Sequence, residues 1–224
     1  MKTKLLKTLL LATLILNAAS GYGQELKKQL SSDVCSCFTQ AKGSSTLDFD
    51  TFQNCFGQSL IKYKDDIEKL IDINSDIPEH EQGYRLGNQI YTEVQSDLIH
   101  NCDPFFSLIE EMREASITSM RQQTSQQMID SLSTLIAKHQ TIDLLWQRGT
   151  KYFAFQDLEK AEMDLRECIR LDPNYIQADF FLAWVLERKG EFLKARELYE
   201  KVYSVTNKQE ILLAIDILKR KHKH

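Results

Sequence analysis

The chain has 224 residues, and its 28 Lys and Arg against 32 Asp and Glu give a net charge of −4. Removing residues 1–23 takes away three lysines and no acid, so 25 basic side chains (28 minus 3) would then face 32 acidic ones. This acidic balance argues against general nucleic-acid binding, which depends on phosphate neutralisation by Lys and Arg. With only three prolines, eight glycines and no long alternation of apolar and polar residues, the chain is expected to be all-α.

Residues 1–23 have the pattern of a secretory signal peptide. A basic start with Lys2, Lys4 and Lys7 precedes an apolar run over 9–16, and small residues follow at 18–21. The run is shorter than the ~20 apolar residues that cross a bilayer, which favours cleavage over a membrane anchor. The sequence therefore predicts an exported protein, periplasmic, cell-surface or secreted, with no integral membrane segment after cleavage.

Residues 24–120 are expected to form a helical domain of their own. Apolar residues recur every three or four positions, with turns expected at 43–46 and 74–78. Pro78 and Asp103-Pro104 are typical of helix starts. The four expected apolar stripes are Leu26, Leu30, Val34 and Phe38; Phe52, Phe56, Leu60, Tyr63, Ile67 and Leu70; Leu86, Ile90, Val94 and Leu98; and Phe105, Leu108 and Met112.

Four of the five cysteines, Cys35, Cys37, Cys55 and Cys102, lie in this domain. An even local set in an exported chain predicts two disulfides. Cys35 and Cys37 should point to nearly opposite sides of one helix, so one should reach Cys55 and the other Cys102, in either order. The spacing differs from the close pairs of zinc sites and from Cys-x-x-Cys, which makes a metal- or redox-active domain the weaker alternative. The layout is similar to that of exported bacterial proteins without a known activity.

The C-terminal half repeats itself with a period of about 34 residues, a length that is typical of helical-hairpin repeats. Residues 121–141 are expected to form a connecting helix, followed by two helical hairpins over 142–207. Asp157 is a candidate N-cap, and Asp172-Pro173 should end the helix that follows it. Cys168 is expected to be a packed, inert thiol. The recurring pairs are Gly149 and Ala183, Ala161 and Ala195, Leu165 and Tyr199, and Cys168 and Val202.

This pattern resembles the tetratricopeptide repeat family over about a third of the chain. The chain departs from the family at Arg148, where Leu is usual, at Asp179, where a large apolar residue is usual, and at Asn207, where a second proline would stand. The resemblance implies antiparallel helix pairs stacked into a curved array, whose first helices line a concave face that often holds a peptide. The matching residues are Leu145, Gly149, Tyr152, Ala161, Leu165 and Pro173, then Leu182, Ala183, Leu186, Gly190, Phe192, Ala195 and Tyr199.

The implied concave face carries the candidate ligand-binding site. Aromatic side chains on this line can grip an apolar or extended peptide. The Lys and Asn clamp with which chaperone-binding members of the family hold a C-terminal carboxylate is absent from these positions. The chain itself can also fill the groove, and the helix expected over 126–138 has an apolar stripe suited to this. The candidate residues are Trp146, Thr150 and Phe153 in the first copy, and Phe180, Trp184 and Glu187 in the second.

Residues 208–224 are expected to form a capping helix and a basic tail. Ile211, Leu212, Ile215 and Leu218 give the helix an apolar stripe, as the end of a repeat array needs. The basic run over 219–224 is interpreted as a solvated helix end rather than as an anion or metal contact.

The sequence contains no catalytic motif such as Gly-x-Ser-x-Gly, His-Glu-x-x-His or a Walker loop. We therefore expect no enzyme activity, and we assign no cofactor and no metal site. The leading hypothesis is an exported, disulfide-stapled protein that binds a polypeptide partner, or organises an assembly, through its repeat domain. The alternatives are a metal- or redox-active cysteine domain with a docking module, and a self-assembling structural subunit whose groove takes a helix from a neighbour.

Overall fold

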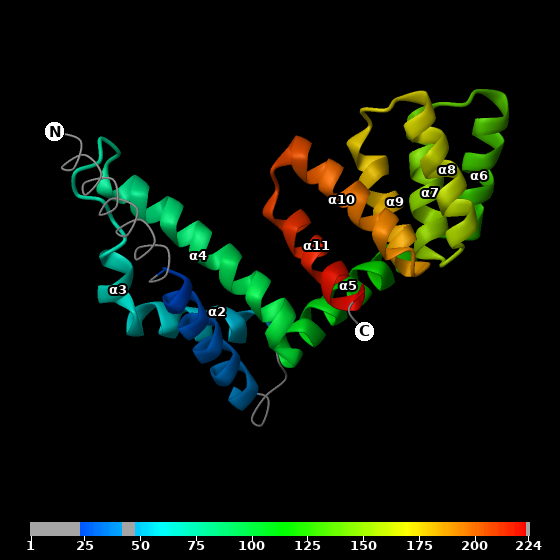
Figure 1. Ribbon diagram of the computed structural model, residues 1–224. Helices are drawn as coiled ribbons and strands as arrows, with labels where there is room; N and C mark the ends of the chain where they lie inside the picture. Colours follow the sequence, from blue (N-terminus) through cyan, green and yellow to red (C-terminus); the bar gives the residue numbers. More distant parts are fainter. Residues whose placement is uncertain (1–22, 42–47, 223–224) are drawn as a thin grey trace. The chain divides into compact units, whose positions relative to one another are not determined.

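The computed structural model describes residues 23–41 and 48–222, which form helices joined by turns and short loops (Figure 1). This described part contains no strand, so the prediction of an all-α chain is confirmed. The predicted signal peptide lies outside the described residues except for Gly23, and so do the expected turn at 43–46 and the last two residues of the basic tail. Within the described ranges, no helix is long and apolar enough to cross a membrane.

The chain divides into two compact units, Met1–Leu108 and Ile109–His224, which we call the N-terminal unit and the C-terminal unit. The division falls inside helix α5 (Asp103–Gln122), and therefore before the predicted domain end at residue 120. The second half of α5 thus belongs with the repeat region that follows it in the chain.

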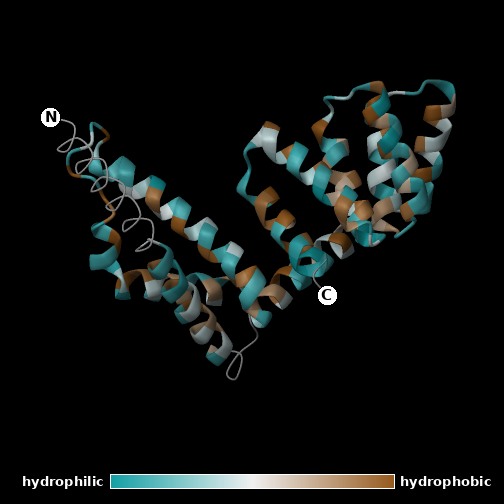
Figure 2. Cartoon of the chain, in the orientation of Figure 1, coloured by the Kyte–Doolittle hydropathy of each residue, from teal (hydrophilic) through white to brown (hydrophobic). Residues whose placement is uncertain are grey.

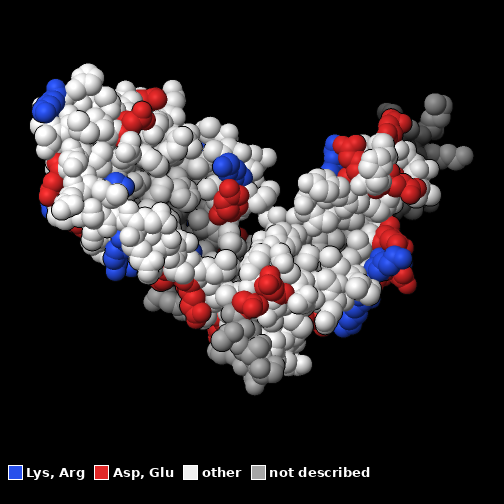
Figure 3. All heavy atoms as spheres, turned by 180° about the vertical axis from the view of Figure 1, so that it is seen from behind, with Lys and Arg blue, Asp and Glu red and all other residues white. Residues whose placement is uncertain are grey.

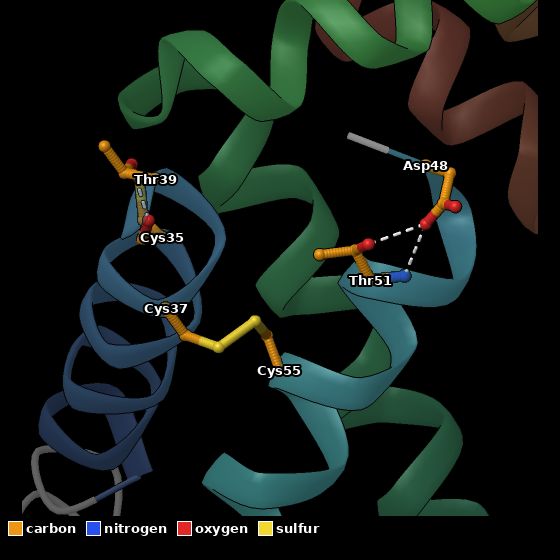
Figure 4. Close-up of a disulfide and its surroundings, with 6 residues drawn as sticks. All are labelled: Cys35, Cys37, Thr39, Asp48, Thr51 and Cys55. Carbon is orange, nitrogen blue, oxygen red and sulfur yellow. Dashed lines mark hydrogen bonds between the residues drawn. A yellow bond between two sulfur atoms is a disulfide. The ribbon is translucent and has the colours of Figure 1, made fainter. Parts of the chain in front are cut away.

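Local signals in the sequence fix the helix starts of the N-terminal unit. Asp48 accepts a hydrogen bond from the backbone N–H of Thr51 at 2.8 Å and so caps α2 (Figure 4). Pro78 directly precedes α4, as predicted. Tyr63 separates α2 from α3, and Leu70 lies in the turn after α3, so the stripe predicted to continue to Leu70 is interrupted. The helices of this unit are residues 23–41, α2 (Phe49–Lys62), α3 (Lys64–Glu68), α4 (Glu79–Asn101) and the start of α5.

An aromatic cluster fills the core of the N-terminal unit. The Phe52 ring centre lies 4.8 Å from that of Phe105, and Phe38 meets Phe105 edge-on at 6.3 Å. Apolar bands interrupt the polar surface along these helices, as periodic burial requires (Figure 2). The stripe predicted on the first helix is confirmed, because all its members are buried: Leu26, Leu30, Val34 and Phe38.

Two disulfides link the helices of this unit, and they confirm the predicted pairs. Cys35 bonds to Cys102 across 67 residues. Cys37 bonds to Cys55 across 18 residues, as Figure 4 shows. Cys35 and Cys37 bond to different partners because residues two apart on a helix face different neighbours. All four sulfurs lie in crosslinks, which is the disulfide-stapled form that the leading hypothesis predicts.

Stacked helices form the C-terminal unit. Glycine allows the closest approach in it: a Cβ built on Gly149 would lie 3.2 Å from Asp164 Cβ and 3.3 Å from Leu165 Cγ. The predicted crossing of α7 and α8 at a small residue is therefore confirmed. The helices after α5 are α6 (Gln126–Lys138), α7 (Ile142–Ala154), α8 (Leu158–Leu171), α9 (Ile176–Arg188), α10 (Phe192–Thr206) and α11 (Gln209–His222).

Both hairpins use the same turn, at positions one repeat apart. Gln156 has φ 63° and Gly190 has φ 79°, so each ends the first helix of its hairpin in the left-handed conformation. The next residue then donates its backbone N–H to a carbonyl five residues earlier, at 2.9 Å in both copies. In the first copy that residue is Asp157, which also caps α8 as predicted.

Candidate functional site

The first helices of the two hairpins, α7 and α9, bring four of the six predicted binding residues together. We call the surface around Trp146, Thr150, Phe180 and Trp184 the first-helix face. All four side chains are half-buried. The Trp146 ring meets Phe181 edge-on at 5.9 Å, and Phe180 meets Trp184 at 6.2 Å. The predicted aromatic line is therefore a contiguous cluster of rings.

The other two predicted binding residues, Phe153 and Glu187, lie beneath this surface. Phe153 is fully buried, and its ring centre lies 4.9 Å from that of Trp184. Glu187 is 4% exposed and is enclosed by charged partners. Neither side chain is therefore open at this surface in the folded chain, and a ligand contact by either stays a prediction.

Glu187 is the centre of a buried charge cluster. Its two carboxylate oxygens accept hydrogen bonds from Arg113 at 2.8 and 2.6 Å, and one of them also accepts from Lys221 at 2.9 Å. The guanidinium carbon of Arg113 lies 5.5 Å from the centre of the Trp184 ring. Glu110 also pairs with both Arg113 and Lys221. Helices α5, α9 and α11 therefore meet in one ionic network.

Glu187 and Arg113 keep their charges in this network. Burial alone would raise the pKa of Glu187, but hydrogen bonds and positive charge from Arg113, together with Lys221, hold that pKa below its ordinary value. Burial works to lower the pKa of Arg113, yet the Glu187 carboxylate more than offsets it and raises the pKa. Burial and the nearby Glu187 raise the pKa of Tyr199, so its hydroxyl stays protonated.

The helix that occupies part of the first-helix face is α5. Ile117 is 1% exposed and belongs to the core of the repeat region. Arg121 Nε donates to the backbone carbonyl of Ala154 at the end of α7, at 2.8 Å. The sequence placed this segment in the N-terminal domain. The signal that could have found it is the continuation of the apolar pattern past Met112 to Ile117 and Met120.

The helix predicted to fill the groove, α6, packs elsewhere. Ser133 of α6 accepts a hydrogen bond from Arg148 of α7 at 3.1 Å. Met128 and Leu135, two members of its predicted stripe, are about half exposed, at 47% and 48%. Self-occupation of the face is therefore seen for α5, whereas α6, the segment that the sequence suggested, contacts α7 through Ser133.

An apolar groove beside α5 remains open. A cavity of about 550 Å³ lies between α9, α10 and α11, and a second of about 290 Å³ lies between α5, α9 and α11. Phe180 and Glu210 line both cavities, so the two lie side by side. Phe181, Val202 and Val205 add apolar walls to the larger one. The groove has the size and chemistry of a binding site for side chains of a peptide.

The buried Cys168 thiol and the distribution of surface charges also bear on the chemistry of the chain. The Cys168 thiol is buried, as expected, and burial with the nearby Asp164 raises its pKa to about 12, which disfavours the reactive thiolate. On the described part of the face drawn in Figure 3, acidic and basic side chains lie beside one another, without an extended basic patch. Within the C-terminal unit, Glu162 pairs with both Arg166 and Lys189.

Comparison with protein families agrees with this geometry. Residues 142–175, which comprise α7, α8 and the turn after them, match the family model of the tetratricopeptide repeat. The C-terminal half therefore contains a tetratricopeptide repeat, a unit that generally serves protein–protein interaction. The chain matches no curated protein and no solved structure.

Proposed function

We propose that this chain is an exported, non-enzymatic protein that binds a polypeptide partner in the apolar groove of its repeat region. The observation that carries the proposal is the groove itself, two neighbouring cavities that share Phe180 of α9 and Glu210 of α11. Tetratricopeptide repeats generally act as interaction modules, and the family match in α7 and α8 supports such a role for the repeat region.

The chemistry of the groove favours a peptide with apolar side chains. Phe180 and Phe181 are half-buried, so their rings have area left to cover. Val205 stands at the rim with 64% of its surface exposed. Aromatic and aliphatic area of this kind releases water when a partner covers it, at about 25 cal/mol per Å². Trp146 and Thr150 continue the same face along α7.

The two disulfides support export. Crosslinks of this kind form and persist in oxidising compartments and are rare where glutathione keeps thiols reduced. Together with the secretory pattern of residues 1–23, they favour a periplasmic, cell-surface or secreted location.

A pair of matched substitutions on α10 tests the groove. Val205→Glu places a charge in it, whereas Leu193→Glu places the same charge on a similarly exposed apolar residue that lines neither cavity. Both proteins and the wild type are used to capture partners from an envelope extract of the source cells. We expect Val205→Glu to lose the captured polypeptide by about tenfold or more, which corresponds to about 1.4 kcal/mol, and Leu193→Glu to retain it. Equal capture by the two variants, with both folded by circular dichroism, would contradict binding in the groove.

A further inference from the structure

Helix α5 contacts the repeat region through a single stripe of side chains. Arg113, Ile117 and Arg121 are spaced by four residues and so share one face of the helix. Arg113 binds Glu187, Ile117 enters the core, and Arg121 binds the carbonyl of Ala154. Between residues 109 and 122, Ile109 and Ile117 are buried, and the partly buried Met120 packs against the core of the repeat region. The helix therefore rests on the first-helix face through a few apolar side chains and a few ionic contacts.

Arg113 occupies a position beside Glu187 that fits a guanidinium group. We call this position the Glu187 place. The Glu187 side chain is 2% exposed and offers both oxygens to the two terminal nitrogens of Arg113. The Trp184 ring lies against the same group as a cation–π partner. A planar, forked cation fits such a bidentate and stacked position, whereas an ammonium group satisfies only part of it.

A second charge pair sets the direction of the helix on this face. Glu114, the residue after Arg113, pairs with Arg188, the residue after Glu187. On α9 an acid is followed by a base, and on α5 a base is followed by an acid, so the two charge pairs are complementary. This pattern specifies which way a helix lies and which residue of it enters the Glu187 place.

The first-helix face extends beyond the part that α5 covers. The cavity of about 290 Å³ lies directly beside the stripe, where Met112, Arg113 and Ser116 form its α5 wall. Ser116 is exposed and presents only a small hydroxyl group toward this space. A helix with a larger apolar residue at that position would fill the cavity and bury more apolar area than α5 does.

Resting on the proposed function, we propose that the first-helix face recognises an amphipathic helix with an arginine and an aliphatic residue one turn later, and that residues 109–122 are its resident occupant. A partner helix of this chemistry displaces α5 from the face. The arginine enters the Glu187 place, the aliphatic residue takes the position of Ile117, and an apolar residue at the position of Ser116 fills the cavity.

Three labelled peptides test this recognition on the full wild-type chain. The first copies residues 109–124, the second carries Ser116→Leu and the third carries Arg113→Gln, with binding followed by fluorescence anisotropy. The tethered α5 competes at an effective concentration in the millimolar range, so the first peptide should bind weakly. We expect the Ser116→Leu peptide to bind about fivefold or more tightly than the first, and the Arg113→Gln peptide to show no binding.

A substitution in the full chain, rather than in the peptide, also tests the displacement of α5. Arg113→Gln in the full chain weakens the resident helix, and Arg166→Gln, at an exposed residue of α8, is the matched control. The peptide copying 109–124 should bind the Arg113→Gln chain about tenfold more tightly than the control chain. If Arg113→Gln does not fold, the order of the three peptides on the wild-type chain decides alone.

Equal binding of the Ser116→Leu and Arg113→Gln peptides, or no binding of any peptide to either folded chain, overturns the proposal. This failure is distinct from a failure of the proposed function. If the Val205→Glu variant still loses its captured partner while the peptides do not bind, the groove binds a polypeptide of other chemistry. A third outcome is that the peptides bind in the expected order while Val205→Glu captures as much partner as the wild type. The first-helix face then recognises the arginine-containing helix, and the proposed binding in the groove is wrong.

Discussion

Single residues at the hairpin turns show how the two copies keep the same geometry with different side chains. The second copy has Gly190 in the left-handed conformation, where a glycine carries no steric penalty. The first copy has Gln156 at the equivalent place, one repeat earlier, with φ 63°. A residue with a Cβ is strained in this conformation. The first turn therefore has a conformational energy cost that the second turn lacks.

We therefore expect Gln156→Gly to raise the free energy of unfolding by about 1 kcal/mol, and Gly190→Ala to lower it by about 1 kcal/mol. Urea denaturation followed by circular dichroism measures both. Gly87→Ala is the control, because Gly87 lies inside α4 with free space where its Cβ would be, so helix propensity alone should stabilise that variant. A loss of stability in Gln156→Gly would contradict the assignment of strain to this turn.

Residues that depart from the family pattern were visible in the sequence, but their partners were not. Arg148 stands where an apolar residue is usual, and it binds both carboxylate oxygens of Asp164, at 2.8 and 2.7 Å. Asp179, another departure, lies 2.6 Å from Lys201. Periodicity identifies a position on a helix, whereas an ion pair depends on which side chain a neighbouring helix places opposite it.

At the scale of elements, the sequence predicted most helices but did not determine which helices pack against one another. Helix starts at Pro78 and Asp103 and the cap at Asp157 depend on local chemistry, so they could be read directly. The pairing of the cysteines depends on how helices pack, and either order was compatible with the spacing. The role of α5 was missed for the same reason, because its apolar pattern does not say which neighbour it packs against.

The two disulfides should contribute unequally to the stability of the N-terminal unit. Cys35–Cys102 closes 67 residues and Cys37–Cys55 closes 18, so a chain-entropy account gives about 4 and about 3 kcal/mol respectively. Removing the first with Cys35→Ser/Cys102→Ser should thus destabilise the unit more than Cys37→Ser/Cys55→Ser. Near-ultraviolet circular dichroism of the aromatic core during urea unfolding measures this. Under reducing conditions, the two variants and the wild type should become similar, and the reverse ranking in the oxidised state would contradict the prediction.

At the scale of the whole chain, a buried ionic network joins three helices of the C-terminal unit. Glu187 links α9 to Arg113 of α5 and to Lys221 of α11, which are separated in the chain by more than the length of the repeats. Breaking one partner of a buried pair leaves the other charge uncompensated, at a cost of about 3 kcal/mol or more. The cohesion of this unit should therefore depend on the ionised state of Glu187.

Acid should weaken the C-terminal unit through this residue. The pKa of Glu187 is lowered in the folded state, so the unfolded chain binds the proton first as pH falls. The stabilisation is present above the ordinary value of about 4.5 and is lost as pH falls toward the folded pKa. At neutral pH, Glu187→Gln should lower the free energy of unfolding by about 3 kcal/mol, and the difference from wild type should shrink below pH 4.5.

Urea denaturation at several pH values tests this dependence. Glu200→Gln is the matched control, since Glu200 lies on α10 with 54% of its side chain exposed and forms only a surface pair. A difference between Glu187→Gln and wild type that stays constant down to pH 3 would show that the carboxylate does not carry the acid sensitivity.

The choice of arginine as partner for both Glu187 and Asp164 has a practical consequence on the alkaline side. A guanidinium group stays protonated throughout the range in which proteins are handled, and both Arg113 and Arg148 have a raised pKa. These internal pairs therefore keep their charges when the medium is made basic. Amine-directed crosslinking, which needs deprotonated lysines at about pH 9, can be applied to the intact repeat region to map which lysines a bound polypeptide covers.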